Sequence, residues 1–341
     1  MAPDKGGKSA GGKTGGGKHR GARGRGGKAG PLKAERPGPA ADMPMPALLA
    51  SEDARGPDFI CIGAQKAGTR WLFDQLALHP DFWMPPIKEL HYLNASKRFL
   101  KFARPLLASA DRNLTTTNRR RAKRMERALA PGDIDWLRAR IWLHKQPIDL
   151  DRYARLFALR GERLSGDICP PYAIIPDGEA AAVRARFPEA RIVYLVRDPV
   201  ERFWSQYCMI LRRHPEPEPE ALATVRDFMA RSTGDAHSAM VSVVRRWRLG
   251  DDDARFGLYF FDDLKTGAAD LRRRIVGFLG GDPDRGSEAI APDHNRKATQ
   301  AKIAMAPEVR DYLVEHFAGE IRQAATELGG PALAWQKKYG L

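Results

Sequence analysis

Cysteine is scarce in this sequence: its 341 residues include only Cys61, Cys169 and Cys208. The three are far apart in the chain, odd in number and without the spacing of metal ligands, which argues against a disulfide scaffold and a structural zinc site. Two of them fall inside apolar runs. We therefore expect reduced cysteines in the protein core.

Long apolar runs are also missing. No stretch approaches the ~20 consecutive apolar residues of a membrane-spanning helix, and the N-terminus lacks the apolar segment of a secretory signal. A cytoplasmic location is the simplest expectation. With 43% apolar residues, the chain is long enough to bury one large core or two modest ones.

Acidic residues are outnumbered, 42 against 57 Lys and Arg, so the formal net charge is +15. About half of the excess lies in residues 1–40, which hold six Lys and four Arg but only Asp4 and Glu35 as acids. The same residues contain thirteen glycines and almost no large apolar side chain, so burial cannot offset the entropy of ordering them. We expect a disordered basic tail and linker over residues 1–55 and one folded domain over 56–341.

The stretch from Phe59 to Phe73 reads as a short apolar strand, a turn of small residues with one lysine, and an amphipathic helix. Such a turn gathers backbone N–H groups and the positive end of a helix dipole, where a phosphate is held. Gly63 and Gly68 have the spacing of the nucleotide-triphosphatase loop, but the lysine is Lys66, inside the loop. This departure argues against an ATPase and favours a donor with one transferable group. An ordinary strand-turn-helix with a solvated lysine is the simpler alternative.

Polar residues among large apolar ones mark a second candidate segment. Residues 79–94 are bounded by prolines, and Lys88, Glu89 and His91 lie there among apolar and aromatic residues. This mixture is more typical of the wall of a site than of a solvated loop. We expect a short strand and a loop in this segment.

A third segment begins with Arg197, at the end of another apolar run. Asp198 is a suitable N-cap, a proline follows it at the first helical position, and Glu201 completes a capping box. Ser205 lies off the apolar stripe of the helix, so packing does not explain this residue.

The order of the elements predicts the fold class. Apolar runs at 59–62, 191–196 and 256–261 do not alternate with polar residues, which is typical of parallel strands covered by helices on both faces. Further helices are expected near 149–159, 178–187, 220–249, 263–280 and 307–327, with an extended turn at 166–172. We expect an α/β fold, a single P-loop-like domain with a central, mostly parallel sheet flanked by helices. Ligands bind such sheets at the carboxyl ends of the strands, where Lys66 and Arg197 fall.

Residues 95–145 differ in character. Between 95 and 130, eleven Lys or Arg, including Arg119, Arg120 and Arg121, stand against Asp111 and Glu126. Helical spacing is present over 97–107, 117–130 and 134–144. We favour a solvated helical insertion, and a binding face that guides an anionic acceptor is the alternative.

Three motifs occur in a fixed order along the chain: Gln65-Lys66-Ala67-Gly68-Thr69-Arg70, Lys88-Glu89-Leu90-His91-Tyr92, and Arg197-Asp198-Pro199-x-Glu201-Arg202-x-x-Ser205-x-Tyr207. Together they resemble the sulfotransferases that use 3′-phosphoadenosine 5′-phosphosulfate (PAPS). The likeness is closest to the heparan-sulfate-type and bacterial carbohydrate branch. It covers roughly residues 57–341 and is weakest over the basic segment. Each motif alone is a weak signal, but the three in this order are specific.

The resemblance implies that PAPS is the co-substrate and that no metal is needed. It implies that residues 65–70 (Gln65, Lys66, Ala67, Gly68, Thr69 and Arg70) surround the 5′-phosphosulfate and that Lys66 stabilises the leaving phosphate oxygen. Arg197 and Ser205 would hold the 3′-phosphate. Arg296 and Lys297 look like the family's later basic loop over the nucleotide.

The resemblance also gives Glu89 the place of the catalytic base, with His91 close behind it. An acceptor hydroxyl must lose its proton as it attacks sulfur, and a partly desolvated carboxylate can take that proton. Alternatively, Glu89 pairs with Lys66 or Lys88 and only fixes the loop.

These observations predict transfer of a sulfuryl group from PAPS to a hydroxyl or amine, and the resemblance implies a carbohydrate or glycoconjugate acceptor. Two other classes stay open. A P-loop-type nucleotide kinase would need a magnesium-binding hydroxyl and an acidic partner for its triphosphate. A nucleic-acid-binding protein would use the basic tail for contacts that depend on salt and not on sequence.

Overall fold

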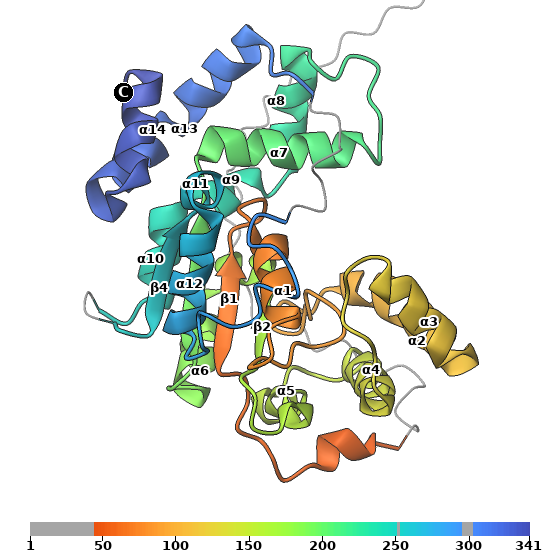
Figure 1. The fold of residues 1–341 in the computed structure, drawn as a ribbon. Coiled ribbons are helices and arrows are strands. Elements are labelled where there is room, and N and C mark those ends of the chain that lie inside the picture. The colour runs from red at the N-terminus through yellow and green to blue at the C-terminus, as the bar shows by residue number, and fades with distance from the viewer. Residues whose placement is uncertain (1–43, 251–252, 295–302) are drawn as a thin grey trace, which may run out of the picture. The chain divides into compact units, whose positions relative to one another are not determined.

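The computed structural model describes residues 44–250, 253–294 and 303–341 (Figure 1). Most of the expected tail lies outside the described residues, and so do Arg296 and Lys297. The end of the expected linker is described and is packed against the domain. Residues Ala47–Ala50 form a 3₁₀ turn, Leu49 is buried, and Arg155 donates a hydrogen bond to the carbonyl of Ser51.

Four strands form one sheet in the order β2-β1-β3-β4. They are β1 (Phe59–Gly63), β2 (Gly166–Ile168), β3 (Arg191–Val196) and β4 (Phe256–Phe260). Every pairing is parallel. All residues of β1 and β3 are buried except Arg191. The prediction of an α/β fold with a mostly parallel sheet is confirmed.

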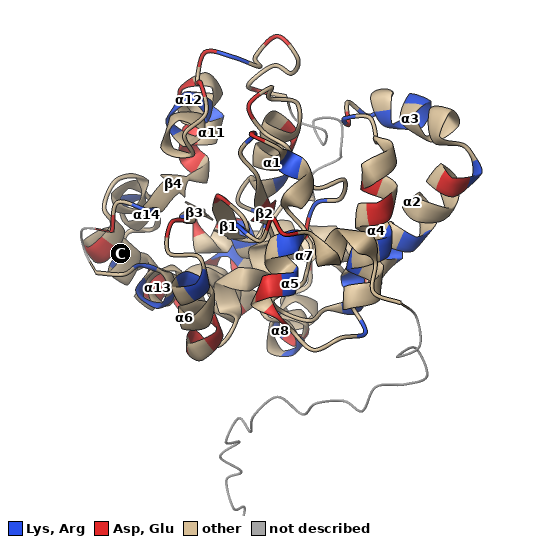
Figure 2. Ribbon diagram, turned by 90° about the horizontal axis from the view of Figure 1, so that it is seen from below, with Lys and Arg blue, Asp and Glu red and all other residues tan. Residues whose placement is uncertain are grey.

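Helices cover both faces of the sheet, which explains the uninterrupted apolar strands. In Figure 2, α1 (Thr69–Ala77) and α12 (Ala268–Phe278) lie on one side of the strands, and α6 (Asp177–Arg186) and α13 (Pro307–Leu328) lie on the other. The core therefore extends to both sides of the strands.

Helix α7 (Pro199–Leu211) begins as the sequence predicts. Asp198 Oδ1 accepts hydrogen bonds from the backbone N–H groups of Val200 and Glu201. The Glu201 carboxylate, which we expected to complete a capping box, instead pairs with Arg197 and with Lys338 of α14 (Pro331–Tyr339). The start of α7 is therefore tied to the last helix of the chain.

The basic segment is helical, as expected. It contains α2 (Leu100–Arg112), α3 (Leu114–Ala122) and α4 (Pro131–Leu143), with the 3₁₀ turn η2 (Lys97–Phe99) before them. The side chain of Asn113 caps α3 by accepting a hydrogen bond from the N–H of Thr116. In α4, Trp136 is fully buried and its Nε1 donates to the carbonyl of Leu156 at 2.7 Å. The insertion is thus joined to the domain core and is only partly solvated.

Two local expectations are wrong around β2. Residues 79–94 contain no strand, and only a single parallel bridge joins Phe82 to Leu164, because the prolines remove backbone donors. Residues 166–172 form β2 and the start of the 3₁₀ helix η4 (Pro170–Ile174) in place of an extended turn. Prolines fit the first positions of such a helix, where an N–H has no partner to lose.

Several expected helices are shorter or divided. The stretch 220–249 forms α8 (Leu222–Arg231), α9 (Gly234–Ser238) and α10 (Met240–Trp247), and 263–280 forms α11 (Phe261–Thr266) and α12. The expected helix over 149–159 is α5 (Leu150–Arg155) followed by the 3₁₀ turn η3 (Ala158–Arg160). Helix α14 was not predicted.

The three cysteines are buried and form no disulfide, as expected. Among the helices of the described ranges, none combines the length and the apolar character that crossing a bilayer requires.

Candidate active site

Three of the sequence-predicted segments meet at the carboxyl edge of the sheet. The turn with Lys66 follows β1, Arg197 follows β3, and Cys169 follows β2. The Cys169 Sγ lies 3.8 Å from Nδ1 of His91, which brings the second segment to the end of β2. Because β1 lies between β2 and β3, the turn with Lys66 is central to this edge.

The turn after β1 has the backbone of an anion-binding loop. Gly68 is the N-cap of α1 with φ of 95°, and a Cβ there would lie 3.2 Å from Leu264 and 3.3 Å from Phe261, so glycine is required. It offers no side chain to the N–H groups of the first turn of α1. Lys66 also has a left-handed backbone, with φ of 72°. The helix start is thus available to an acceptor from outside the chain.

The remaining residues of the first motif have distinct environments. Ala67 and Thr69 are buried, and Gln65 has a buried side-chain oxygen with no hydrogen-bond partner within the described residues. Arg70 points elsewhere: its Nε lies 3.0 Å from Asp74 Oδ1, and its Nη2 lies 3.7 Å from Glu126 of the insertion. Arg70 therefore links α1 to the insertion.

Arg197 joins the first and third motifs. Its Nη1 donates to the carbonyl of Lys66 at 3.0 Å, its Nη2 donates to Glu201 at 3.2 Å, and its guanidinium lies 4.6 Å from the centre of the Phe261 ring. Its Nε is buried and has no partner in the part of the chain that the structure describes. Ser205 lies one helical turn beyond Glu201 on the same face of α7 and is half-buried.

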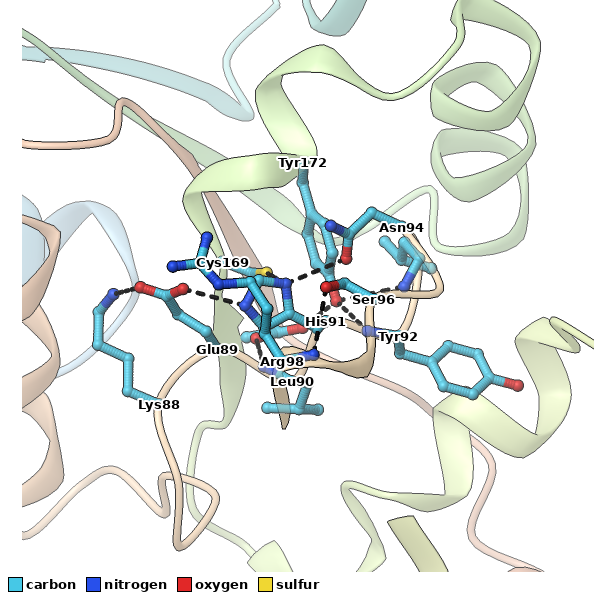
Figure 3. Close-up of polar contacts among 12 residues, drawn as sticks. Lys88, Glu89, Leu90, His91, Tyr92, Asn94, Ser96, Arg98, Cys169 and Tyr172 are labelled. Atoms are coloured by element: carbon cyan, nitrogen blue, oxygen red, sulfur yellow. Dashed lines mark hydrogen bonds and ion pairs between the residues drawn. The ribbon is translucent and has the colours of Figure 1, made fainter. Parts of the chain in front are cut away.

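Glu89 lies between two basic side chains (Figure 3). Lys88 Nζ donates to Glu89 Oε1 at 2.8 Å, and His91 Nε2 lies 3.2 Å from Glu89 Oε2. On the other side of the imidazole ring, His91 Nδ1 lies 3.3 Å from the side-chain oxygen of Asn94. The four side chains form one polar chain at the end of β2.

The electrostatics of Glu89 keep it ionised. Burial alone would raise the pKa of its carboxyl, but Lys88 and His91 outweigh burial and hold the pKa well below its usual range. A proton acceptor must be unprotonated at the working pH, and Glu89 meets this requirement, but so low a pKa also makes its carboxylate a weak base. The Lys88 contact is also one that the loop-fixing alternative requires.

Sequence reasoning missed the residues that support this segment. Asn94 lies beside His91, Asp167 accepts a hydrogen bond from the backbone N–H of Leu90, and Arg140 donates to the carbonyl of Leu90. Asp167 offered little local sign of its burial, because it lies in a strand of only three residues. Arg140 gave no such signal, because it is one of many arginines in a segment that looks solvated.

Three arginines of the insertion bind the carbonyl groups of residues 84–90. Arg121 donates to Pro86, Arg127 to Met84, and Arg140 to Leu90. These contacts correct the expectation of a purely solvated insertion. Its other basic residues, including Lys97, Lys101, Arg104, Arg119 and Arg120, are exposed.

Comparison with known proteins agrees with the motifs. A model of the sulfotransferase family matches residues 57–282. A solved structure of a sulfotransferase from Alicyclobacillus acidocaldarius is 23% identical, with a TM-score of 0.56 over 82% of this chain and 98% of that one. At this identity the likeness supports the fold alone.

Two further structures are more distant. The sulfotransferase domain of the Synechococcus PCC 7002 olefin synthase is 20% identical, with a TM-score of 0.46 over 77% of this chain and 94% of that one. A sulfotransferase from Mycobacterium avium is 17% identical, with a TM-score of 0.44 over 82% of this chain and 79% of that one. Among curated proteins, none matches the sequence.

Proposed function

Because the chain belongs to the sulfotransferase family, we propose that it transfers a sulfuryl group from PAPS to a hydroxyl or amine of a carbohydrate or glycoconjugate. Membership of this family favours a sulfotransferase over the nucleotide kinase and the nucleic-acid-binding protein that the glycine turn and the basic tail also allowed. The observation that carries the proposal is the hydrogen bond from Arg197 to the carbonyl of Lys66, with the Glu89–His91 pair at the end of the neighbouring strand.

The donor would be held by the first and third motifs. Residues 65–70 would surround the 5′-phosphosulfate, and the N–H groups at the start of α1 support this role because they lack a side-chain cap. Arg197 and Ser205 would hold the 3′-phosphate. In support, the Arg197 guanidinium is largely buried and pairs with Glu201. Ser205 lies on the same face of α7 as Glu201. Arg296 and Lys297 remain proposed donor ligands outside the described residues.

In the reaction, PAPS supplies the sulfuryl group. Residues of this chain would stabilise the charge that develops on the donor and accept the proton of the acceptor. The Lys66 ammonium would stabilise the phosphate oxygen from which the sulfuryl group departs. Glu89 would accept the proton of the acceptor hydroxyl, and its 34% exposed side chain supports this role because an acceptor can reach it. His91, itself buried, would orient the carboxylate through the 3.2 Å contact.

The acceptor would meet the exposed basic side chains of the insertion. Exposed basic side chains on η2, α2 and α3 support an acceptor that carries negative charge, because clustered positive charge raises the local concentration of anions. A sugar with sulfate or uronic acid groups fits this description. The resemblance to the carbohydrate branch supports the same class.

A transfer assay tests the proposal. The protein is incubated with PAPS labelled on the sulfuryl group and with glycans, glycolipids and phenols, and parallel reactions contain ATP labelled on the terminal phosphate. We expect label from PAPS on a carbohydrate, no label from ATP, and loss of transfer in Lys66→Ala. Transfer of phosphate from ATP, or binding of neither PAPS nor its desulfated product, would refute the proposal.

A further inference from the structure

The backbone that carries Glu89 and His91 is held from both sides at the residue between them. Asp167 Oδ1 accepts a hydrogen bond of 3.4 Å from the N–H of Leu90. Arg140 donates to the carbonyl of Leu90 from Nε at 3.1 Å and from Nη2 at 2.5 Å. One contact fixes the peptide group that joins Glu89 to Leu90, and the other fixes the peptide group that joins Leu90 to His91.

This stretch needs such support because its conformation is unfavourable. Glu89 has φ of 67° and His91 has φ of 51°, and side-chain-bearing residues rarely adopt the left-handed region. Residues in such conformations persist only when the surrounding structure holds them there. The unusual backbone turns the Glu89 and His91 side chains toward each other (Figure 3).

Two tyrosine hydroxyls hold the carboxylate of Asp167 in place. It is fully buried in β2, and its Oδ2 accepts hydrogen bonds from the hydroxyls of Tyr172 at 2.7 Å and Tyr153 at 3.2 Å. The Tyr172 hydroxyl in turn accepts from the backbone N–H of Tyr92 at 3.0 Å. The network therefore continues past His91 along the same segment.

Arg140 reaches the same point from the insertion. It lies in α4, is 1% exposed, and places its guanidinium 4.5 Å from the centre of the Phe99 ring and 5.2 Å from that of Tyr92. The opposite charges of Arg140 and Asp167 thus stand on the two sides of Leu90. Burying two charges is costly unless each is paired or well hydrogen-bonded, so their place at one residue calls for a reason beyond packing.

We propose that Arg140 and Asp167 are positioning residues that hold Glu89 and His91 in the geometry for proton transfer. Neither side chain accepts or donates the transferred proton; both act through the backbone of Leu90. The proposal rests on the base role proposed for Glu89. It also gives the insertion a part in the reaction, since α4 supplies one half of this support.

The test compares Arg140→Lys and Asp167→Asn with a matched control, Arg184→Lys. Arg184 is also a buried arginine and donates to the Ala190 carbonyl and to Asp253, next to the starts of β3 and β4 at the opposite edge of the sheet. For each variant, the melting temperature, the dissociation constant of the desulfated donor, and kcat and acceptor KM are measured. The profile of kcat against pH is recorded from the lowest pH at which the variants stay folded, about 3, up to neutral pH, so that it covers the ordinary range for glutamate.

Arg140→Lys and Asp167→Asn should lower kcat by about 10- to 100-fold, the cost of a misplaced reacting group, while donor affinity stays within about two-fold. As the segment loosens, Glu89 loses its basic neighbours and its pKa rises toward the ordinary ~4.3, so kcat should fall at a higher pH than in the wild type. Arg184→Lys should lose thermal stability but keep kcat and the pH profile.

Wild-type kcat and pH profile in both folded variants would overturn the proposal, and so would an equal loss of kcat in Arg184→Lys. If either variant fails to fold, Tyr153→Phe provides a milder test with the same expected direction, because it removes one hydroxyl from Asp167 Oδ2. Glu89→Gln is measured in parallel. If Glu89→Gln is as fast as the wild type, the base role itself is wrong; if it is slow while the Arg140 and Asp167 variants are normal, only the positioning role is wrong.

Discussion

Arg197 donates a hydrogen bond of 3.0 Å to the backbone carbonyl of Lys66, which joins the end of β3 to the turn that follows β1. The two residues are 131 positions apart, and the parallel pairing of β1 with β3 places them together. Arg197 and the turn that carries Lys66 are therefore joined directly. The proposed donor site depends on this contact.

Arg197→Ala should weaken the binding of PAPS and of its desulfated product alike, because the proposed contact is to a phosphate that both carry. A lost charge-assisted hydrogen bond costs about 1.5–3 kcal/mol. Ser205→Ala should act in the same direction but more weakly. Titration with 3′-phosphoadenosine 5′-phosphate and with the analogue that lacks the 3′-phosphate measures the effect, and unchanged discrimination between the two would remove both residues from the site.

The pH dependence of turnover should respond to Lys88. This residue helps to hold the pKa of Glu89 below its usual range, so the Glu89 carboxylate stays ionised as the pH falls through the ordinary range for glutamate. In Lys88→Met the pKa of Glu89 should rise, and the acid limb of kcat should move to higher pH. A profile that matches the wild type would show that Glu89 does not limit the rate.

The exposed arginines of α3 should affect the acceptor and not the donor. Replacing Arg119 and Arg120 by glutamate should raise the acceptor KM and flatten its dependence on salt. The reason is that the attraction between these arginines and an anionic acceptor, which salt weakens, is removed. Arg121→Glu serves as a control for the two exposed positions. Arg121 is buried against Glu126 and Pro86, so this change should lower the melting temperature. Equal acceptor KM at all salt concentrations would leave only the solvated-helix interpretation for Arg119 and Arg120.

We expect the folded domain to begin near Pro44 and not at Arg55, which two truncated chains can test. A chain that starts at Pro44 should retain donor affinity, because the preceding residues are rich in glycine and charge. A chain that starts at Arg55 loses the buried Leu49 and should melt at a lower temperature. Loss of donor binding in the longer of the two chains would place part of the donor site in the tail.

Local patterns were enough to predict most of the fold. The uninterrupted apolar runs of β1 and β3 predicted a covered parallel sheet, and Asp198 predicted the start of α7. Strand β2 was missed because it has only three residues and contains Asp167, a fully buried acid that tertiary hydrogen bonds satisfy. No local pattern contains that information.

Some residues of the candidate site could likewise be predicted from local motifs, and others could not. Lys66, Glu89, Arg197 and Ser205 could be named from motifs, since each belongs to a short stretch with a fixed spacing. Arg140 could not, because its role depends on a contact with Leu90, 50 positions away, and on its burial among aromatic rings. In the sequence, Arg140 looks like one more solvated basic residue of the insertion. Only the packing of α4 shows that it is buried.

The saturated rate of sulfuryl transfer by Glu89→Gln, measured together with donor affinity, tests the central claim most directly. The amide keeps the size of the side chain but cannot accept the proton, so the rate should fall by ~10²–10⁴. The dissociation constant of PAPS should stay nearly unchanged, because the proposed donor contacts come from the turn after β1 and from α7. A variant that binds PAPS weakly but turns over at nearly the wild-type rate when saturated would contradict the base role of Glu89 and leave it as a residue that fixes the loop.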